Sequence, residues 1–157
     1  MANTYTQLYV HYIFAVQNRQ SLTHNYIKEQ VCKYISGVIE QQGHKTFAIN
    51  GMPDHLHILV SMNPKQSPSD LMYNVKRSSS LWINKNKLTD NKFGWQDGFG
   101  AFSYGKSQIP DIAGYIEKQQ THHKKRTFQE EYVEFLNVFD IEYDERYLLK
   151  PVEYLHS

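Results

Sequence analysis

Apolar residues follow regular spacings along most of the chain. In the first such stretch, YTQLYVHYIFAV at residues 5–16, β-branched and aromatic residues dominate, which predicts a long strand. Between residues 26 and 39 the apolar positions instead return every three to four residues, which predicts a helix, and Gly43 is a suitable end for it. The apolar positions of this helix are Tyr26, Ile27, Val31, Tyr34, Ile35, Val38 and Ile39.

Two short apolar runs come next, at residues 45–52 and 55–62. They lie on either side of a Pro-Asp turn and therefore predict a hairpin of two strands. After them, Ser67 and Pro68 have the form of a helix N-cap followed by proline at the first helical position. The apolar positions of this second helix are Leu71, Val75 and Trp82.

The remaining stretch predicts a loop, a strand and two more helices. Residues 84–100 are polar and punctuated by glycine, which predicts a loop. Residues 101–104 form the last predicted strand, and residues 128–139 form the last predicted helix. Between them, Ile109, Ile112 and Ile116 mark a third helix entered near Pro110. The order strand–helix–strand–strand–helix–strand predicts an α+β, ferredoxin-like (split βαβ) antiparallel sheet, with helices on one face plus C-terminal helices. We expect one domain over residues 1–157, with an acidic tail from about residue 141.

Composition narrows the class of protein. The chain has 157 residues, of which 40% are hydrophobic, a size and composition that suit one soluble domain. Cys32 is the only cysteine, which excludes an internal disulfide and a cysteine zinc cluster. No apolar run approaches the roughly 20 residues that span a membrane, and the N-terminus has no signal-peptide pattern. We therefore expect a cytoplasmic protein with no membrane partner.

The net charge of +1 conceals an uneven distribution. Residues 1–126 hold fifteen Lys or Arg and eight Asp or Glu, a balance of +7, whereas residues 127–157 hold two and eight, a balance of −6. This asymmetry fits a basic surface for nucleic acid joined to an acidic tail. It equally fits two solvated faces of one globule.

Two histidines follow the Pro53-Asp54 turn. Because successive strand residues point to opposite faces, His55 and His57 project to the same side, and Leu56 projects to the other. Neutral imidazoles bind Mn, Zn, Fe or Ni, and two of them suit an open metal site completed by substrate oxygens. Taken alone, the pair also fits two ordinary half-exposed histidines.

The third predicted helix offers further groups for such a site. Tyr115, Gln119 and His122 fall at i, i+4 and i+7, and therefore share one face of a helix. Four cations around this face would suit contact with phosphates. They are Lys118, Lys124, Lys125 and Arg126. A tyrosine packed at the margin of the core is the alternative interpretation of Tyr115.

Four motifs in order carry a family resemblance over nearly the whole chain. They are PDHLHILV, KRSSSLW, WQDGFGAFSYGKSQ and YIEKQQTHHKKRTFQEEY. With them, the chain resembles the single-tyrosine HUH transposases of small bacterial insertion sequences and their REP-associated relatives. HUH denotes two histidines around a hydrophobic residue, here His55-Leu56-His57.

The resemblance implies a function and a set of roles. His55 and His57 would bind Mg²⁺ or Mn²⁺, Gln119 would be the third ligand, and Tyr115 would attack single-stranded DNA to give a 5′-phosphotyrosine. The DNA would be the hairpin ends of an insertion sequence. Further candidate DNA-binding residues are Lys76, Arg77 and His122. The resemblance also implies a homodimer, with Tyr115 acting in cis or in trans, and we expect the long apolar first strand to offer pairing at a sheet edge.

Three other functions stay open at this point. The first is a domesticated relative that cleaves hairpin repeats on the chromosome without mobilising an element. The second is a non-catalytic, RRM-like nucleic-acid-binding module, for which the chain has no K/R-G-F/Y-type signature. The third is a metal-dependent hydrolase that uses water, for which Tyr115 would be incidental.

Overall fold

The computed structural model describes residues 3–17, 22, 25–119 and 127–149. Within this part of the chain, four strands and four α-helices follow one another in the predicted order. They are β1 (Tyr9–Ala15), α1 (Asn25–Gln41), β2 (Lys45–Met52), β3 (His55–Ser61), α2 (Pro68–Lys85), β4 (Gly100–Tyr104), α3 (Ile109–Glu117) and α5 (Phe128–Val138). Two short 3₁₀ turns, η1 (Lys106–Gln108) and η2 (Glu145–Tyr147), complete the set.

The strands form one antiparallel sheet in the order β2-β3-β1-β4. With α1 and α2 as the two crossovers, this is the ferredoxin-like arrangement, which confirms the predicted fold class. One expectation is wrong: β1 lies in the interior of the sheet, paired with both β3 and β4, so the edges are β2 and β4. The first strand is predominantly apolar because both of its faces are covered.

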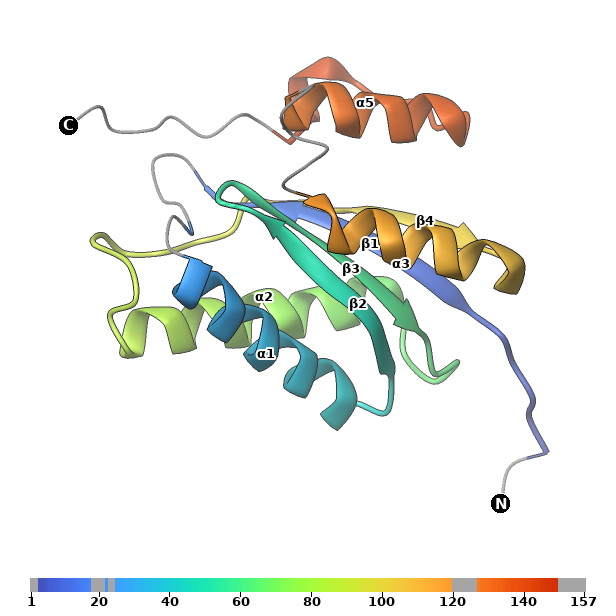
Figure 1. Ribbon diagram of the computed structural model, residues 1–157, viewed down its shortest axis with the longest axis horizontal. Helices are drawn as coiled ribbons and strands as arrows, with labels where there is room; N and C mark the ends of the chain where they lie inside the picture. The colour runs from blue at the N-terminus through green and yellow to red at the C-terminus, as the bar shows by residue number, and fades with distance from the viewer. Residues whose placement is uncertain (1–2, 18–21, 23–24, 120–126, 150–157) are drawn as a thin grey trace.

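Helices α1 and α2 cover one face of the sheet (Figure 1). The core between them and the sheet includes Tyr12, Phe14, Leu56 and Ile58, the strand residues that point to this side. Helix α2 begins as predicted, because the Ser67 side chain accepts a hydrogen bond from the backbone N–H of Asp70. Most of the apolar positions predicted for these two helices are buried or half-buried, but Tyr26 of α1 is 70% exposed.

Helices α3 and α5 lie on the opposite face of the sheet (Figure 1). Helix α3 buries Ile116 against Ala48 and Leu59, and α5 buries Phe128, Tyr132 and Leu136 against β1 and β4. The hydroxyl of Thr127 caps α5 by accepting a hydrogen bond from the backbone N–H of Glu130. The residues of β3 that face this second layer include His55 and His57, so the candidate site lies between the sheet and the two C-terminal helices.

Residues 94–99 return the chain to the sheet before β4. The backbone N–H of Gln96 donates to the carbonyl of Ala15, and the carbonyl of Gly94 accepts from Gln17, so this segment borders the end of β1. The indole of Trp95 donates to the hydroxyl of Ser79 on α2. Among the helices described here, none is both long enough and apolar enough to cross a membrane.

Candidate active site

Strand β3 delivers the two histidines to the layer under α3 and α5. His55 pairs with Ala15 of β1, and His57 pairs with Ile13. Both histidine side chains have 0% exposure, so the alternative of two half-exposed surface histidines does not describe them. Their common face follows from the twofold alternation of side chains along a strand.

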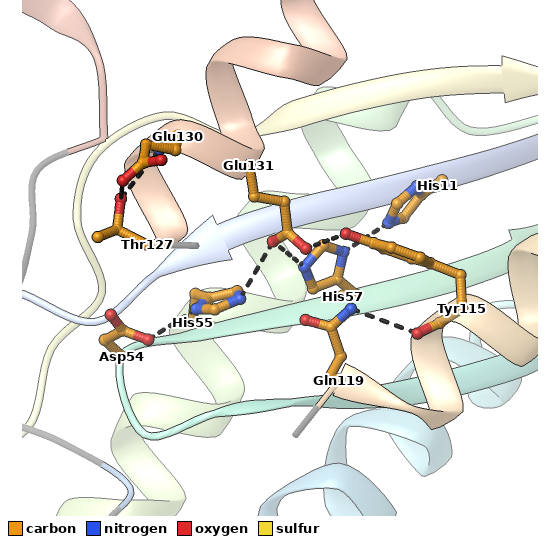
Figure 2. A network of polar contacts seen from close by, with 9 residues as sticks. All are labelled: His11, Asp54, His55, His57, Tyr115, Gln119, Thr127, Glu130 and Glu131. Atoms are coloured by element: carbon orange, nitrogen blue, oxygen red, sulfur yellow. Dashed lines mark hydrogen bonds and ion pairs between the residues drawn. The ribbon is translucent and has the colours of Figure 1, made fainter. Parts of the chain in front are cut away.

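Each histidine is held through its Nδ1 atom (Figure 2). The Nδ1 atom of His55 lies 2.7 Å from Oδ1 of Asp54, and that of His57 lies 2.8 Å from Nε2 of His11 on β1. Metal-binding histidines characteristically use one ring nitrogen for the metal and the other for an orienting partner. Here both Nε2 atoms are turned toward the same carboxylate, that of Glu131.

Glu131 reaches the histidines from α5. Its Oε1 atom lies 3.0 Å from Nε2 of His57 and 3.5 Å from Nε2 of His55, and its side chain has 0% exposure. Its Oε2 atom accepts a hydrogen bond from the hydroxyl of Tyr115 on α3. One buried carboxylate therefore connects the two histidines with the tyrosine, as Figure 2 shows.

The electrostatic environment acts differently on the neighbouring histidines. Burial, reinforced by the nearby His57, lowers the pKa of His11 well below its usual value, against a smaller opposing influence of Glu131. Burial also opposes a charge on His55, but its hydrogen bond to Asp54 and the nearby Glu131 carboxylate outweigh burial and raise its pKa. The carboxylates thus favour a positive charge beside them, which is the electrostatic condition for holding a cation.

Tyr115 and Gln119 come close to the histidines. The Tyr115 ring lies 6.0 Å from the His57 ring, centroid to centroid, and the buried Gln119 amide donates to the Tyr115 carbonyl at 3.4 Å. Helix α3 ends at Glu117, with Lys118 as its C-cap, so Gln119 lies just beyond the end of this helix. His122 lies outside the described residues.

Of the other predicted DNA-binding residues, those that the structure describes do not all lie near the two histidines and Tyr115. Lys118 is exposed beside the site, whereas Lys124, Lys125 and Arg126 fall outside the described residues. Lys76 and Arg77 lie on α2, across the sheet from the histidines, and line a groove of about 490 Å³ between α2 and residues 94–99. The Lys76 ammonium donates to the carbonyls of Gln96 and Gly98, and burial lowers its pKa to about 8.

Three residues of the site escaped the sequence analysis: His11, Asp54 and Glu131. His11 lies two residues before Ile13 on β1, so the two side chains point to the same face of the sheet. Asp54 lies in the turn between β2 and β3, directly before His55. Glu131 lies in the acidic first turn of α5, beside the exposed Glu130. Glu131 falls three residues after Phe128, on the apolar stripe of the helix, and that position was the available signal.

The side chains of His55, His57 and Glu131 could together hold a metal ion. Their candidate ligand atoms all lie within 4.8 Å of one another, and all three residues are buried. Two imidazoles and one carboxylate suit Mn, Fe or Zn, and an amide oxygen such as that of Gln119 is a further ligand type for hard cations. The donor set therefore fits a divalent cation.

Comparison with known proteins identifies the family of the chain. The sequence model described as "Transposase IS200 like" matches residues 4–119. The chain belongs to the IS200-like transposase family. The matched range contains His55, His57, Tyr115 and Gln119, but it ends before α5.

Individual IS200-like relatives extend the comparison. The chain is 24% identical over 118 residues to the ISDra2 transposase TnpA of Deinococcus radiodurans, which covers 72% of this chain and 84% of that protein. A candidate transposase of known structure from D. radiodurans R1 superposes with a TM-score of 0.59 at 18% identity, over 76% of this chain and 95% of the other. The REP-associated tyrosine transposase, solved with a REP hairpin, superposes with a TM-score of 0.52 at 16% identity, over 74% of this chain and 68% of the other. At these identities the two structures establish the shared fold.

Proposed function

We propose that this IS200-like transposase is a metal-assisted single-strand DNA endonuclease and strand transferase with Tyr115 as its nucleophile. One observation carries the proposal: the Tyr115 hydroxyl and the Nε2 atoms of His55 and His57 converge on a single buried carboxylate within one chain. The convergence supports action in cis. A tyrosine that only packed at the core margin would not need to meet two histidines there.

The proposed reaction exchanges one phosphoester for another. The Tyr115 oxygen forms a bond to phosphorus and loses its proton, while the bond from phosphorus to the 3′-oxygen breaks and that oxygen gains a proton. The products are a 5′-phosphotyrosine and a free 3′-OH. Attack by the 3′-OH of another strand reverses the exchange and joins DNA without ATP, because the bond energy is retained in the covalent intermediate.

His55 and His57 are the proposed metal-holding residues, and Gln119 is the further ligand that the resemblance implies. Bound Mg²⁺ or Mn²⁺ would supply charge neutralisation and orientation for the scissile phosphate. Asp54 and His11 would keep the two Nε2 atoms directed at the cation. Because imidazole must be unprotonated to bind a metal, cation affinity would fall at a pH low enough to protonate His55.

Two other tyrosines lie near the site and are weaker candidates for the nucleophile. Tyr104 lies on β4 with its ring 6.1 Å from that of His11, and burial raises its pKa to about 12. Tyr132 stacks on Phe128, and burial raises its pKa as well. The Tyr115 hydroxyl, in contrast, donates a hydrogen bond to Glu131, the carboxylate that lies at the two histidines.

The proposed DNA partner is single-stranded DNA with hairpin ends, as in an insertion sequence. The REP-associated structural neighbour is described as bound to a REP hairpin, which supports a hairpin ligand for this chain. A domesticated nuclease acting on chromosomal hairpin repeats would use the same residues. The sheet face of an RRM-like module must be open for base stacking, whereas here α1 and α2 cover one face and α3 and α5 cover the other.

Seven residues are the proposed DNA-binding set: Lys76, Arg77, Lys118, His122, Lys124, Lys125 and Arg126. Lysine and arginine near the nucleophile would contact phosphates rather than read bases. Changing the four cations after Tyr115 to alanine should therefore make the salt dependence of single-stranded DNA binding shallower, by about 0.7 in the log–log slope for each lost phosphate contact. An unchanged slope would remove these cations from the DNA surface.

Assembly and location are further parts of the proposal. We infer a homodimer from the family resemblance, with the edge strands β2 and β4 as the available pairing surfaces. A monomer of 18.5 kDa in sedimentation, with and without DNA, would contradict it. The cytoplasmic location expected from the sequence stays a prediction.

The decisive experiment is capture of a covalent adduct. The protein is incubated with single-stranded DNA from the flanks of its own gene and Mg²⁺, and adducts are resolved by denaturing electrophoresis. Tyr115→Phe removes only the hydroxyl and should abolish the adduct, whereas Tyr26→Phe, on the exposed side of α1, should not. An adduct formed by Tyr115→Phe would contradict the proposed mechanism.

A further inference from the structure

Glu131 occupies the centre of the site, yet it comes from a helix that lies outside the family match. Burying a carboxylate is costly unless the charge is compensated by partners. Here the compensating groups are two histidine rings and a tyrosine hydroxyl, all of which the proposed function uses. A carboxylate with no role at the site would be a poor choice for this position, because leucine would pack there at lower cost.

We propose that Glu131 is the third protein ligand of the divalent cation, so that α5 is part of the active site. The inference rests on the proposed function, because that function supplies the cation. It gives Glu131 a role that the family resemblance had implied for Gln119 alone. It also makes one side chain the connection between the cation and the attacking hydroxyl.

The separations of the donor atoms support this assignment. Adjacent ligands at about 2.1 Å from an octahedral metal are about 3 Å apart. Oε1 of Glu131 lies 3.0 Å from Nε2 of His57 and 3.5 Å from Nε2 of His55, so the carboxylate oxygen is already at near-ligand spacing from both imidazole nitrogens. By contrast, the amide nitrogen of Gln119 is directed at the Tyr115 carbonyl.

Charge gives a second argument. Two neutral imidazoles and the Gln119 amide would leave both positive charges of the cation for the DNA phosphate to balance. One carboxylate halves that charge within the protein, and it adds the hard oxygen ligand that Mg²⁺ and Mn²⁺ prefer. The nearby Asp54 bonds Nδ1 of His55 instead and is therefore an orienting group.

Glu131 is also placed by its own helix. Phe128 stacks on the His55 ring with centroids 4.0 Å apart, and Tyr132 packs against Phe128. These contacts fix the first turn of α5 over β3, and Thr127 caps that turn. The carboxylate is therefore positioned by a packed element rather than by a loop, as a metal ligand requires.

An alternative role for Glu131 is a temporary partner of the histidines that withdraws when the cation binds. The two roles predict opposite effects on cation affinity. A ligand strengthens binding, so its loss weakens affinity. A competing partner must be displaced, so its loss leaves affinity unchanged or improves it.

The test is Mn²⁺ binding by the full chain, followed by the loss of the free-ion electron paramagnetic resonance signal and, separately, by the rise in Tm with added Mn²⁺. Glu131→Gln keeps the shape of the side chain and removes its charge. We expect its Kd for Mn²⁺ to rise at least about 10-fold. Glu130→Gln is the matched control, because it removes the same charge one residue earlier from an exposed side chain and keeps an acceptor for Thr127.

Every outcome separates the inference from the function on which it rests. If the wild type binds Mn²⁺ and Glu131→Gln binds it equally or more tightly, the ligand assignment is overturned and the proposed function stands. If the wild type binds no Mn²⁺, the proposed metal-assisted function fails as well. Should Glu131→Gln not fold, Glu131→Asp replaces it: the shorter carboxylate must weaken Mn²⁺ binding relative to Glu130→Gln, and equal affinity overturns the inference.

Discussion

Replacing Gly51 with alanine should disturb the metal-holding histidines through β2, the strand that pairs with β3. Gly51 lies on β2 opposite Leu56 and close to the backbone of His55. A Cβ atom at Gly51 would lie only 2.1 Å from the carbonyl oxygen of His55, although real Cβ contacts are not shorter than 3.0 Å. The His55 carbonyl would therefore have to retreat by 3.0 − 2.1 = 0.9 Å.

This displacement has two measurable consequences. Overpacking of this kind costs about 1–3 kcal/mol in the free energy of unfolding, which lowers the Tm of a chain of this size by roughly 2–12 °C. A shift of about 1 Å in a ligand-bearing strand also costs on the order of 100-fold in activity. We therefore expect Gly51→Ala to weaken both Mn²⁺ binding and adduct formation, beyond what its loss of stability explains.

The assay compares Gly51→Ala with Gly37→Ala by thermal unfolding and by Mn²⁺ titration at a temperature where both are folded. Gly37 lies in the interior of α1, where an added Cβ has nothing within 4 Å. Alanine there should stabilise the protein by about 0.5–1 kcal/mol and leave Mn²⁺ affinity unchanged. If Gly51→Ala matches the wild type in Tm and in Mn²⁺ affinity, the close approach of β2 to His55 does not constrain the site.

Three further predictions concern residues around the site and in the core. His11→Ala removes the partner of His57 Nδ1 and should raise the Kd for Mn²⁺ by about 10–100-fold, measured by titration; a smaller change would show that His11 does not orient His57. Thr127→Ala removes the α5 cap and should cost about 1 kcal/mol in denaturant unfolding, whereas Thr127→Ser should restore most of it. Burial raises the pKa of Cys32 from 9.0 to about 11, so at pH 8 its thiolate fraction, and hence its alkylation by iodoacetamide, should be about 100-fold lower than in the denatured chain; equal rates would contradict this.

Local sequence patterns predicted the helices and strands, whereas the position of each strand in the sheet depended on long-range pairing. The helical spacing from Tyr26 to Ile39 and the turn at Pro53 act within a few residues, so α1 and the β2–β3 hairpin appear within a residue or two of their expected bounds. The place of β1 depends on partners about 50 and 90 residues away, and a run of apolar residues fits a central strand as well as an edge. For that reason the expected edge position was wrong.

The same distinction applies to the site. His55 and His57 were predictable as a pair, because strand alternation alone puts them on one face. Glu131 was not, because a glutamate among Glu130 and Glu134 resembles a solvated charge until the helix that carries it is packed on the sheet. An acidic residue at an apolar position of an amphipathic helix was the local signal, and it acquires meaning only from the residues it meets.

The site draws on β1, β3, α3 and α5, and this has a consequence for synthesis of the protein. His11 and Glu131, the first and last side chains of the polar network, are 131 − 11 = 120 positions apart in the sequence. At about 5–20 residues per second, a ribosome needs roughly 6–24 s to produce that interval. If α5 completes the site as proposed, a nascent chain would have its sheet and nucleophile in place before it could bind the cation tightly, and chains terminated before α5 would cut DNA poorly.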